Sequence, residues 1–165
     1  MGYNDEWPRM FAEHQQRLRE ALHATSVDIE HIGSTSVAGL AAKPIIDIVV
    51  AVDDITDEEH YLVPVLAAGY TLRVREPGHR LVRTPHRDVH VHFYEKGDQA
   101  ITNYLVLRDR LRLDADDREL YAQTKRALIT QGFDDMNAYS DAKTEVIAAI
   151  MARARAATAR GETSI

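Results

Sequence analysis

The stretch IEHIGSTSVAGLAAKPIIDIVVAV, residues 29–52, decides how this chain folds. It begins and ends as apolar sequence typical of strands, and a Gly33-Ser34 turn follows the first of them. The second predicted strand, Ile45–Val52, is almost continuously apolar, which indicates burial on both faces, and Asp47 is its only charged residue. A small-residue turn that offers backbone N–H groups beside a carboxylate is suited to binding a phosphate together with a metal ion.

Outward from this stretch, the first two thirds of the sequence mix strands with helices and the last third is helical. The predicted strands are Val27–Ile32, Ile45–Val52, Tyr70–Arg75, His79–Arg83 and Asp88–Tyr94. The predicted helices are Pro8–Ala24, a segment from Thr56 to Gly69 in which Pro64 is expected to start a second short turn, Asp98–Leu113, Asp114–Gln131 and Asn137–Ala157. The pattern predicts an α+β fold, a small mixed or antiparallel sheet with a helical C-terminal third.

Length and composition set the outer limits. The 165 residues, 45% of them hydrophobic, predict a single domain over residues 1–158 and a disordered tail over 159–165. Because no apolar run approaches a membrane span or a signal peptide, we expect a soluble cytoplasmic protein with no membrane partner. The formal net charge of -6 argues against an extended nucleic-acid partner. Since cysteine is absent, any metal ion must be held by His, Asp or Glu.

Histidines are concentrated on one predicted strand. The chain has eight histidines, and four of them gather within a short segment, at His79, His86, His90 and His92. Alternation along Asp88–Tyr94 puts His90 and His92 on the same face of that strand. If this strand lies beside the one that carries Asp47, the three side chains share one site.

A series of short motifs begins with Glu30-His31-Ile32-Gly33-Ser34-Thr35-Ser36-Val37, Gly39-Leu40 and Lys43-Pro44-Ile45-Ile46-Asp47-Ile48. It continues with His79-Arg80, His90-Val91-His92, Leu107–Arg112, Tyr121 with Lys125 and Tyr139 with Lys143. In these motifs the sequence resembles the GrpB family, uncharacterised proteins of the nucleotidyltransferase superfamily. The resemblance implies a nucleotidyltransferase-like fold, small mixed sheet flanked by helices, and a family whose members also occur fused to dephospho-coenzyme A kinase domains.

The superfamily pattern also implies a metal site, from which this sequence departs. The pattern is a Gly-Ser turn, then a strand with two carboxylates two residues apart, and a third carboxylate on a neighbouring strand. Gly33-Ser34 and Asp47 match it, but Val49 holds the place of the second acid. Because magnesium prefers oxygen ligands, Asp47 with His90 and His92, and with His31 as a further candidate ligand, is better suited to one softer divalent ion, zinc, manganese or iron.

Each of these residues also has a plain structural interpretation. The Gly33-Ser34 pair alone is an ordinary tight turn, and a buried Asp47 is satisfied by a salt bridge to Lys43 or an arginine. His90 and His92 serve equally well as half-buried residues that form hydrogen bonds, and Lys43 as cover for the sheet edge. The acids Asp114, Asp116 and Asp117 are expected to form a solvated helix start.

The C-terminal helices repeat one spacing. Tyr139 and Lys143 lie one turn apart in line with an apolar stripe, and Tyr121 and Lys125 repeat the arrangement one helix earlier. A lysine on the inward side of a helix needs an anionic partner, which suggests phosphate or nucleotide binding by Lys125, Tyr139 and Lys143. The plain alternative is a surface lysine whose stem packs on the helix.

Two functions therefore remain open. The first is metal-assisted nucleotidyl or phosphoryl transfer. Asp47 would be catalytic and would bind the metal ion together with His90 and His92. Gly33, Ser34 and Lys43 would bind the phosphates of the ligand. The second is a catalytically reduced module that binds a nucleotide or a coenzyme A-related ligand without turnover, and the loss of an acid at Val49 favours it. In both, the partner is a small phosphate-bearing ligand and the cofactor a divalent metal ion (Zn, Mn, Fe or Mg).

Overall fold

The structure is a computed structural model that describes residues 2–130 and 136–159, without the side chains of 128–130 and 136–142. The chain divides into two compact units, Met1–Tyr104 and Leu105–Ile165, and each is described separately below. Residues 160–165, most of the expected tail, lie outside the described residues. Within the described residues, no helix has both the length and the apolar character needed to cross a membrane.

A five-stranded mixed sheet forms the centre of the first unit, with strand order β1-β2-β5-β4-β3. The strands are β1 (Asp28–Ile32), β2 (Ile46–Val52), β3 (Thr71–Glu76), β4 (His79–Arg83) and β5 (Val89–Glu95). β2 runs parallel to β5 in the middle of the sheet, and the other pairs are antiparallel. The expected α+β fold and its strands are therefore confirmed, with each boundary within two residues of its prediction.

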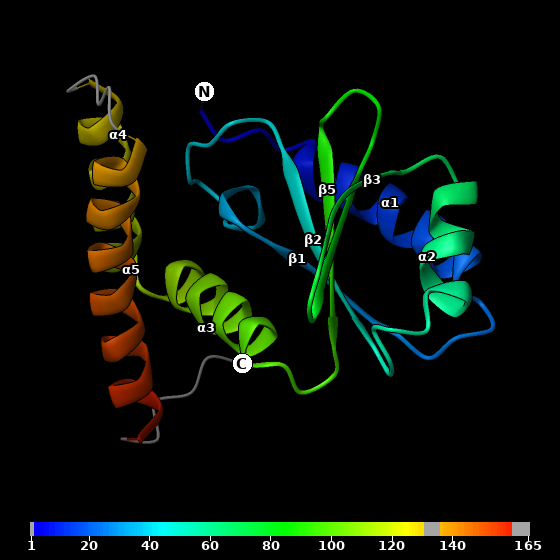
Figure 1. Cartoon of the computed structure of the whole chain (residues 1–165). Coiled ribbons are helices and arrows are strands. Elements are labelled where there is room, and N and C mark those ends of the chain that lie inside the picture. The colour runs from blue at the N-terminus through cyan, green and yellow to red at the C-terminus, as the bar shows by residue number, and fades with distance from the viewer. Residues whose placement is uncertain (1, 131–135, 160–165) are drawn as a thin grey trace. The chain divides into compact units, whose positions relative to one another are not determined.

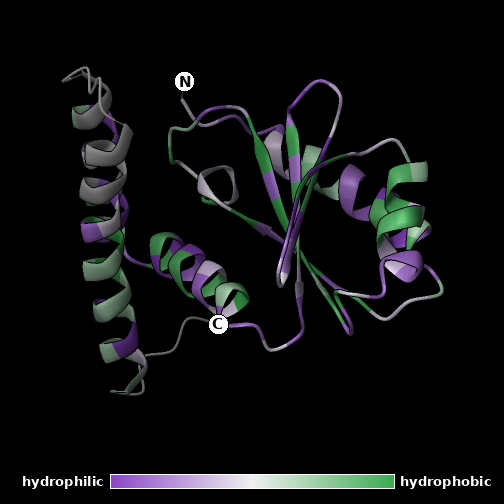
Figure 2. Cartoon of the chain, in the orientation of Figure 1, coloured by the Kyte–Doolittle hydropathy of each residue, from purple (hydrophilic) through white to green (hydrophobic). Residues whose placement is uncertain are grey.

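Two helices cover one face of this sheet. Figure 1 shows α1 (Trp7–Ala21) and α2 (Glu58–Ala67) together on one side of the strands. Alternate residues of the two central strands point toward them and form the core, among them Ile48, Val50, Val91 and Phe93, all fully buried. Figure 2 shows the result, since most of β2 carries the green of hydrophobic residues. Asp47 points to the opposite face, away from this core, and its side chain is 32% exposed.

Pro64 lies inside α2 and does not divide it, so the expected second turn is wrong. Proline has no N–H to donate to the carbonyl four residues earlier, which here belongs to His60. The Thr25 hydroxyl donates to that carbonyl oxygen at 3.0 Å. A side chain from the segment after α1 therefore replaces the missing helical hydrogen bond, and the helix continues.

Helices make up the second unit. α3 (Gln99–Leu113) begins in the first unit and enters the second, where α4 (Ala115–Thr130) and α5 (Met136–Ala159) follow. Asp117, in the first turn of α4, is only 4% exposed, so the prediction of a solvated helix start is wrong for this residue. Arg110 Nε donates to Asp117 Oδ2 at 2.8 Å, and Arg153 Nε donates to Oδ1 at 2.9 Å.

The pKa of Asp117 follows from these contacts. Burial alone would raise the pKa of this carboxyl, but the hydrogen bonds from Arg153 and Arg110 outweigh burial and lower it. A carboxylate with a lowered pKa in the folded state stabilises the fold at pH values above its unfolded pKa of about 3.9, and the benefit is lost as the pH falls. Asp117 thus contributes stability at neutral pH that acid removes.

We expect Asp117→Asn to lower the free energy of unfolding at pH 7 by about 2 kcal/mol, because both guanidinium groups lose a charged acceptor. The contribution of Arg153 is reduced by solvent screening, since its side chain is 44% exposed. Asp116→Asn is the matched control, because Asp116 lies in the same helical turn and is exposed. Urea unfolding measures both variants, and equal midpoints for the two would contradict the buried ion pair.

Candidate functional site

A tight turn after β1 forms one wall of the candidate site. Gly33 has φ 75° and ψ -177°, a conformation that residues with a Cβ rarely adopt, and it leads into the short 3-10 helix η1 (Ser34–Ser36). The backbone N–H and the hydroxyl of Ser36 both donate to the Gly33 carbonyl oxygen, at 3.0 and 2.5 Å. The turn is thus stabilised by hydrogen bonds between its own residues.

The turn lies directly against Asp47. A Cβ atom placed on Gly33 would stand 2.8 Å from Asp47 Oδ2, closer than such contacts occur in proteins. The pairing of β1 with β2 explains this, because Ile32 is the partner of Asp47 and Gly33 follows at the end of the strand. Only glycine allows the backbone to approach the carboxylate this closely.

The wall facing the turn is made by imidazoles of β5. Asp47 on β2 is paired in register with His90 on β5, and His92 follows on the same face of the sheet. The distances to Asp47 Oδ1 are 3.9 Å from His90 Nδ1 and 3.8 Å from His92 Nε2, both longer than a hydrogen bond. The three side chains are 18–32% exposed, so solvent reaches them. The structure therefore brings Asp47, Gly33, His90 and His92 together.

The surroundings of His90 lower the pKa of its imidazole, which favours the neutral form. Burial lowers its pKa most, the Asp47 carboxylate opposes burial, and the neighbouring His92 and Arg83 lower the pKa further. A neutral imidazole keeps one nitrogen lone pair, which accepts a hydrogen bond or binds a metal ion. His90 is therefore in the form that a cation ligand requires.

The ligand types at this site suit one cation, but the donor atoms lie farther apart than the ligands of a bound metal ion. One carboxylate and two imidazoles are ligands that zinc, manganese and iron accept. Two bonds of about 2 Å at a tetrahedral angle would place the donor atoms about 3.3 Å apart, less than the 3.8 and 3.9 Å found here. Among the described residues, no group of three or more His, Asp or Glu side chains has the spacing of a metal centre. Binding would have to draw these side chains inward.

Val49 fills the position of the second carboxylate in the superfamily pattern and is 2% exposed. It points to the same face as Asp47 and pairs with Glu30 on β1 and His92 on β5. A buried valine supplies no metal ligand, so the arrangement of two acids on one strand is absent from β2.

Lys43 and His31 lie on the two segments that lead into the site: Lys43 comes shortly before β2, and His31 is on β1. Lys43 is exposed, and Asp47 forms no ion pair with it in the described part of the chain, so the plain interpretation of Asp47 as the partner of Lys43 is wrong. His31 lies on the core face of β1, where its ring stacks on that of Phe11 with ring centroids 4.8 Å apart. His31 Nε2 lies 3.0 Å from the Thr35 hydroxyl, which donates to the Ile45 carbonyl oxygen. This chain of contacts ties the turn to the start of β2.

The predicted residues of the C-terminal helices belong to the second unit. The Lys125 ammonium lies over the ring of Tyr121, 5.5 Å from its centroid. This contact explains why these two residues stand one helical turn apart. The side chain of Tyr139 lies outside the described residues, and Lys143 is partly buried on α5. Phosphate or nucleotide binding by Lys125, Tyr139 and Lys143 stays a prediction.

Sequence reasoning did not assign roles to Glu76 and His79, which stand behind His92. His79 Nδ1 lies 2.6 Å from Glu76 Oε1, and His79 Nε2 lies 3.1 Å from His92 Nδ1. The His79 ring also stacks on Tyr94, with ring centroids 4.8 Å apart. The available signal was a histidine directly after the Glu-Pro-Gly turn, but its position beside His92 depends on how β4 pairs with β5.

Arginines divide between the two faces of the sheet. Arg75 and Arg80 donate to the Glu58 carboxylate of α2 and lower its pKa, so they serve the fold. Arg83, in contrast, pairs in register with His90, and burial together with the like charges of Arg73 and Arg87 lowers its pKa. Positive charge therefore gathers beside the Asp47 site, although the chain as a whole is acidic.

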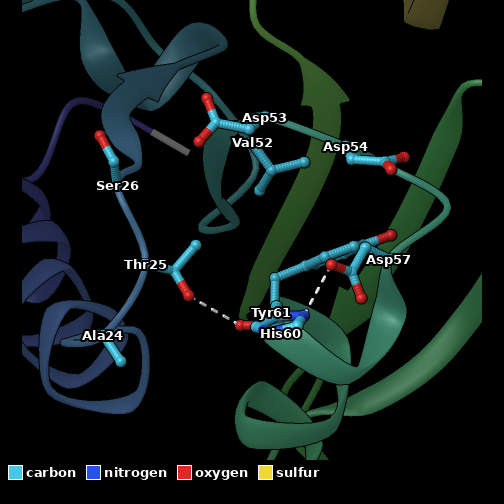
Figure 3. Close-up of a pocket in the computed structure, with 9 residues that line it drawn as sticks. All are labelled: Ala24, Thr25, Ser26, Val52, Asp53, Asp54, Asp57, His60 and Tyr61. Atoms are coloured by element: carbon cyan, nitrogen blue, oxygen red, sulfur yellow. Dashed lines mark hydrogen bonds and ion pairs between the residues drawn. The ribbon is translucent and has the colours of Figure 1, made fainter.

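A hollow of about 250 Å³ lies at the far end of β2 (Figure 3). Its walls carry three acids that have partners: Asp53 pairs with Lys96 at 3.0 Å, the Asp54 carboxylate accepts from Thr56, and Asp57 pairs with His60 at 2.6 Å. Figure 3 shows the Asp57–His60 pair and the Thr25 hydrogen bond to the His60 carbonyl. Because its walls are acidic, this hollow is unsuited to phosphate.

Comparisons with known proteins agree on one family and one fold. The family model described as GrpB protein matches residues 1–153. A UPF0157 protein of Streptomyces coelicolor is 64% identical, over 94% of this chain and 83% of that protein. The crystal structure of the conserved protein GrpB from Enterococcus faecalis has a TM-score of 0.80 and 33% identity, and covers 93% of this chain and 95% of its own.

The fold is also shared with a polymerase. The Cid1 poly(U) polymerase bound to MgGTP has a TM-score of 0.57 at 19% identity, and the match covers 75% of this chain and 43% of the polymerase. This likeness shows the nucleotidyltransferase-like fold and nothing more, because the sequences are distant. The expected fold is thereby confirmed.

Proposed function

This chain belongs to the GrpB family, and on that premise we propose that the turn at Gly33 and Ser34, with Asp47, His90 and His92, binds a nucleotide or a similar phosphate-bearing small molecule together with one divalent cation. The observation that carries the proposal is the close approach of the Gly33 backbone to Asp47, where a Cβ atom added to Gly33 would stand 2.8 Å from Asp47 Oδ2. A backbone forced into a conformation that only glycine tolerates, against the one acid of a buried strand, is typical of functional sites.

Charges around the site suit a ligand with both anionic and cationic parts. Asp47 and the two imidazoles supply electron pairs for a cation, zinc, manganese or iron in preference to magnesium. Arg83 stands on the other side of His90 and Lys43 is exposed near the turn, so both are available for phosphate oxygens. A bound cation would neutralise phosphate charge and hold the ligand against the turn.

Metal-assisted nucleotidyl or phosphoryl transfer is the activity that this arrangement supports if the ligand reacts. Asp47 would orient the ligand's cation, and the backbone N–H groups of the turn would hold phosphate oxygens in place.

A module that binds without turnover is the second candidate, and Val49 favours it. The superfamily reaction uses several carboxylates, whereas β2 here carries one and a buried valine. Such a module would still bind a nucleotide or a coenzyme A-related ligand but would not catalyse its reaction.

Thermal-shift screening tests the proposal. We expect nucleoside triphosphates with Mn²⁺ or Zn²⁺ to raise the unfolding temperature, because a ligand at a hundredfold excess over its dissociation constant stabilises the folded state by about 2.7 kcal/mol. A turnover assay on each ligand that stabilises the protein then separates the two candidates, since product indicates transfer and a shift without product indicates the module. No shift with any nucleotide, with or without metal, would contradict both.

A further inference from the structure

A line of three polar side chains leads from the surface to the Asp47 site. Glu76 at the end of β3 contacts His79 at the start of β4, and His79 contacts His92 on β5. Glu76 has a 57% exposed side chain, whereas the His79 and His92 side chains are 15% and 18% exposed. The Glu76 end of this line is therefore exposed to solvent. The other end is the His92 ring, whose Nε2 faces Asp47.

For a neutral His79 ring, hydrogen-bonding rules give this line a direction. An ionised carboxylate only accepts, so at 2.6 Å from Glu76 Oε1 the proton of the His79 ring is on Nδ1. In the neutral ring Nε2 then carries a lone pair, and at 3.1 Å it accepts from His92 Nδ1–H. With its proton on Nδ1, the neutral His92 ring has a lone pair on Nε2.

The distance on the other side of His92 agrees with this tautomer. His92 Nε2 is 3.8 Å from Asp47 Oδ1, too far for an N–H of His92 to donate to the carboxylate. Two electron-pair donors therefore face each other across this gap, and they attract a cation or a hydrogen-bond donor. A phosphate oxygen would be repelled from the same place.

We propose that Glu76 and His79 are positioning residues that hold His92 in the Nδ1–H tautomer, so that the site takes a cation between His92 Nε2 and Asp47. This rests on the proposed function for the role of the cation, whereas the tautomer follows from the contacts of a neutral His79 ring and does not depend on the cation. The His79 and His92 rings are nearly coplanar, with planes 13° apart and centroids 5.4 Å apart, as an edge-to-edge N···N hydrogen bond requires. The stacking of His79 on Tyr94, with centroids 4.8 Å apart, holds its ring in place without the hydrogen bonds.

The test uses variants of Glu76 because they leave every ring intact. In Glu76→Ala, His79 loses its acceptor and is free to carry its proton on Nε2 and donate to His92, which moves the His92 proton to Nε2. Glu76→Gln is the matched control, since its amide oxygen still accepts from His79. Two-bond ¹H–¹⁵N spectra of the untagged, ¹⁵N-labelled protein distinguish the tautomers, and His92→Gln identifies the His92 signals.

We expect the Nδ1–H form of His92 in the wild type and in Glu76→Gln, and the Nε2–H form in Glu76→Ala. Calorimetric titration with Zn²⁺ alone should show about 10-fold to 100-fold weaker binding in Glu76→Ala, as for other outer-shell partners of metal ligands. A proton on His92 Nε2 in the wild type, or an unchanged tautomer in Glu76→Ala, would overturn the inference. If the wild type has the Nδ1–H form of His92 but does not bind Zn²⁺, the positioning role of Glu76 and His79 is upheld. The same result would contradict the binding of a cation in the proposed function.

Discussion

Gly33→Ala should abolish binding of a nucleotide and metal at the Asp47 site while leaving the fold in place. The new Cβ would lie 2.8 Å from Asp47 Oδ2, so the turn or the carboxylate has to move. A displacement near 1 Å at a functional group costs on the order of 100-fold in activity. In addition, a residue other than glycine at φ 75° strains the backbone by about 1–3 kcal/mol.

Gly39→Ala separates these two effects. Gly39 also has a positive φ, of 83°, but no atom lies within 4 Å of the position where its Cβ would stand. We therefore expect both variants to lose similar stability in urea unfolding, and only Gly33→Ala to lose binding, measured by calorimetry with the nucleotide that stabilises the wild type. Equal losses of affinity in the two variants would show that strain alone matters and that the approach to Asp47 does not.

Asp47→Asn is the second change with a large expected effect. The substitution keeps the shape of the side chain and removes its charge, so we expect the affinity for Mn²⁺ or Zn²⁺ to fall by more than about 100-fold, beyond what the loss of an outer-shell partner costs. Stability should change little, because Asp47 is 32% exposed and its contacts to both imidazoles are longer than hydrogen bonds. The pKa of His90 should fall further, since Asp47 is the group that raises it.

Asp53→Asn controls for the loss of one negative charge. Asp53 follows β2 at its other end and its side chain is 68% exposed, so the net charge changes equally and the Asp47 site is untouched. Metal titration by calorimetry should show wild-type affinity in Asp53→Asn. Equal affinity in Asp47→Asn and Asp53→Asn would contradict the role of Asp47.

Much of the fold and part of the site could be predicted from local sequence. The apolar run of β2 with one acid, and the alternation that puts His90 and His92 on one face of β5, are signals within a few residues. Their meeting depends on β2 and β5 lying side by side, which the sequence leaves open and the parallel pairing of Asp47 with His90 provides.

The features that sequence reasoning missed depend on contacts between distant segments. Pro64 remains inside α2 because Thr25, 39 residues earlier, satisfies the His60 carbonyl. Asp117 is buried because Arg153, which is 36 residues away, reaches it. His79 acquires its place behind His92 only when β4 pairs with β5, 13 residues along the chain. No local pattern contains these partners.

The central claim is that Asp47, the Gly33 turn and the β5 imidazoles form one receptacle for a cation and a phosphate. A crystal structure of the untagged protein with Mn²⁺ and a nucleoside triphosphate, with anomalous data collected for manganese, tests it most directly. We predict an anomalous peak between Asp47 and His92, with phosphate density against the backbone N–H groups at Gly33 and Ser34. Manganese or nucleotide bound only at the Asp53–Asp57 hollow, with no peak at Asp47, would contradict the claim.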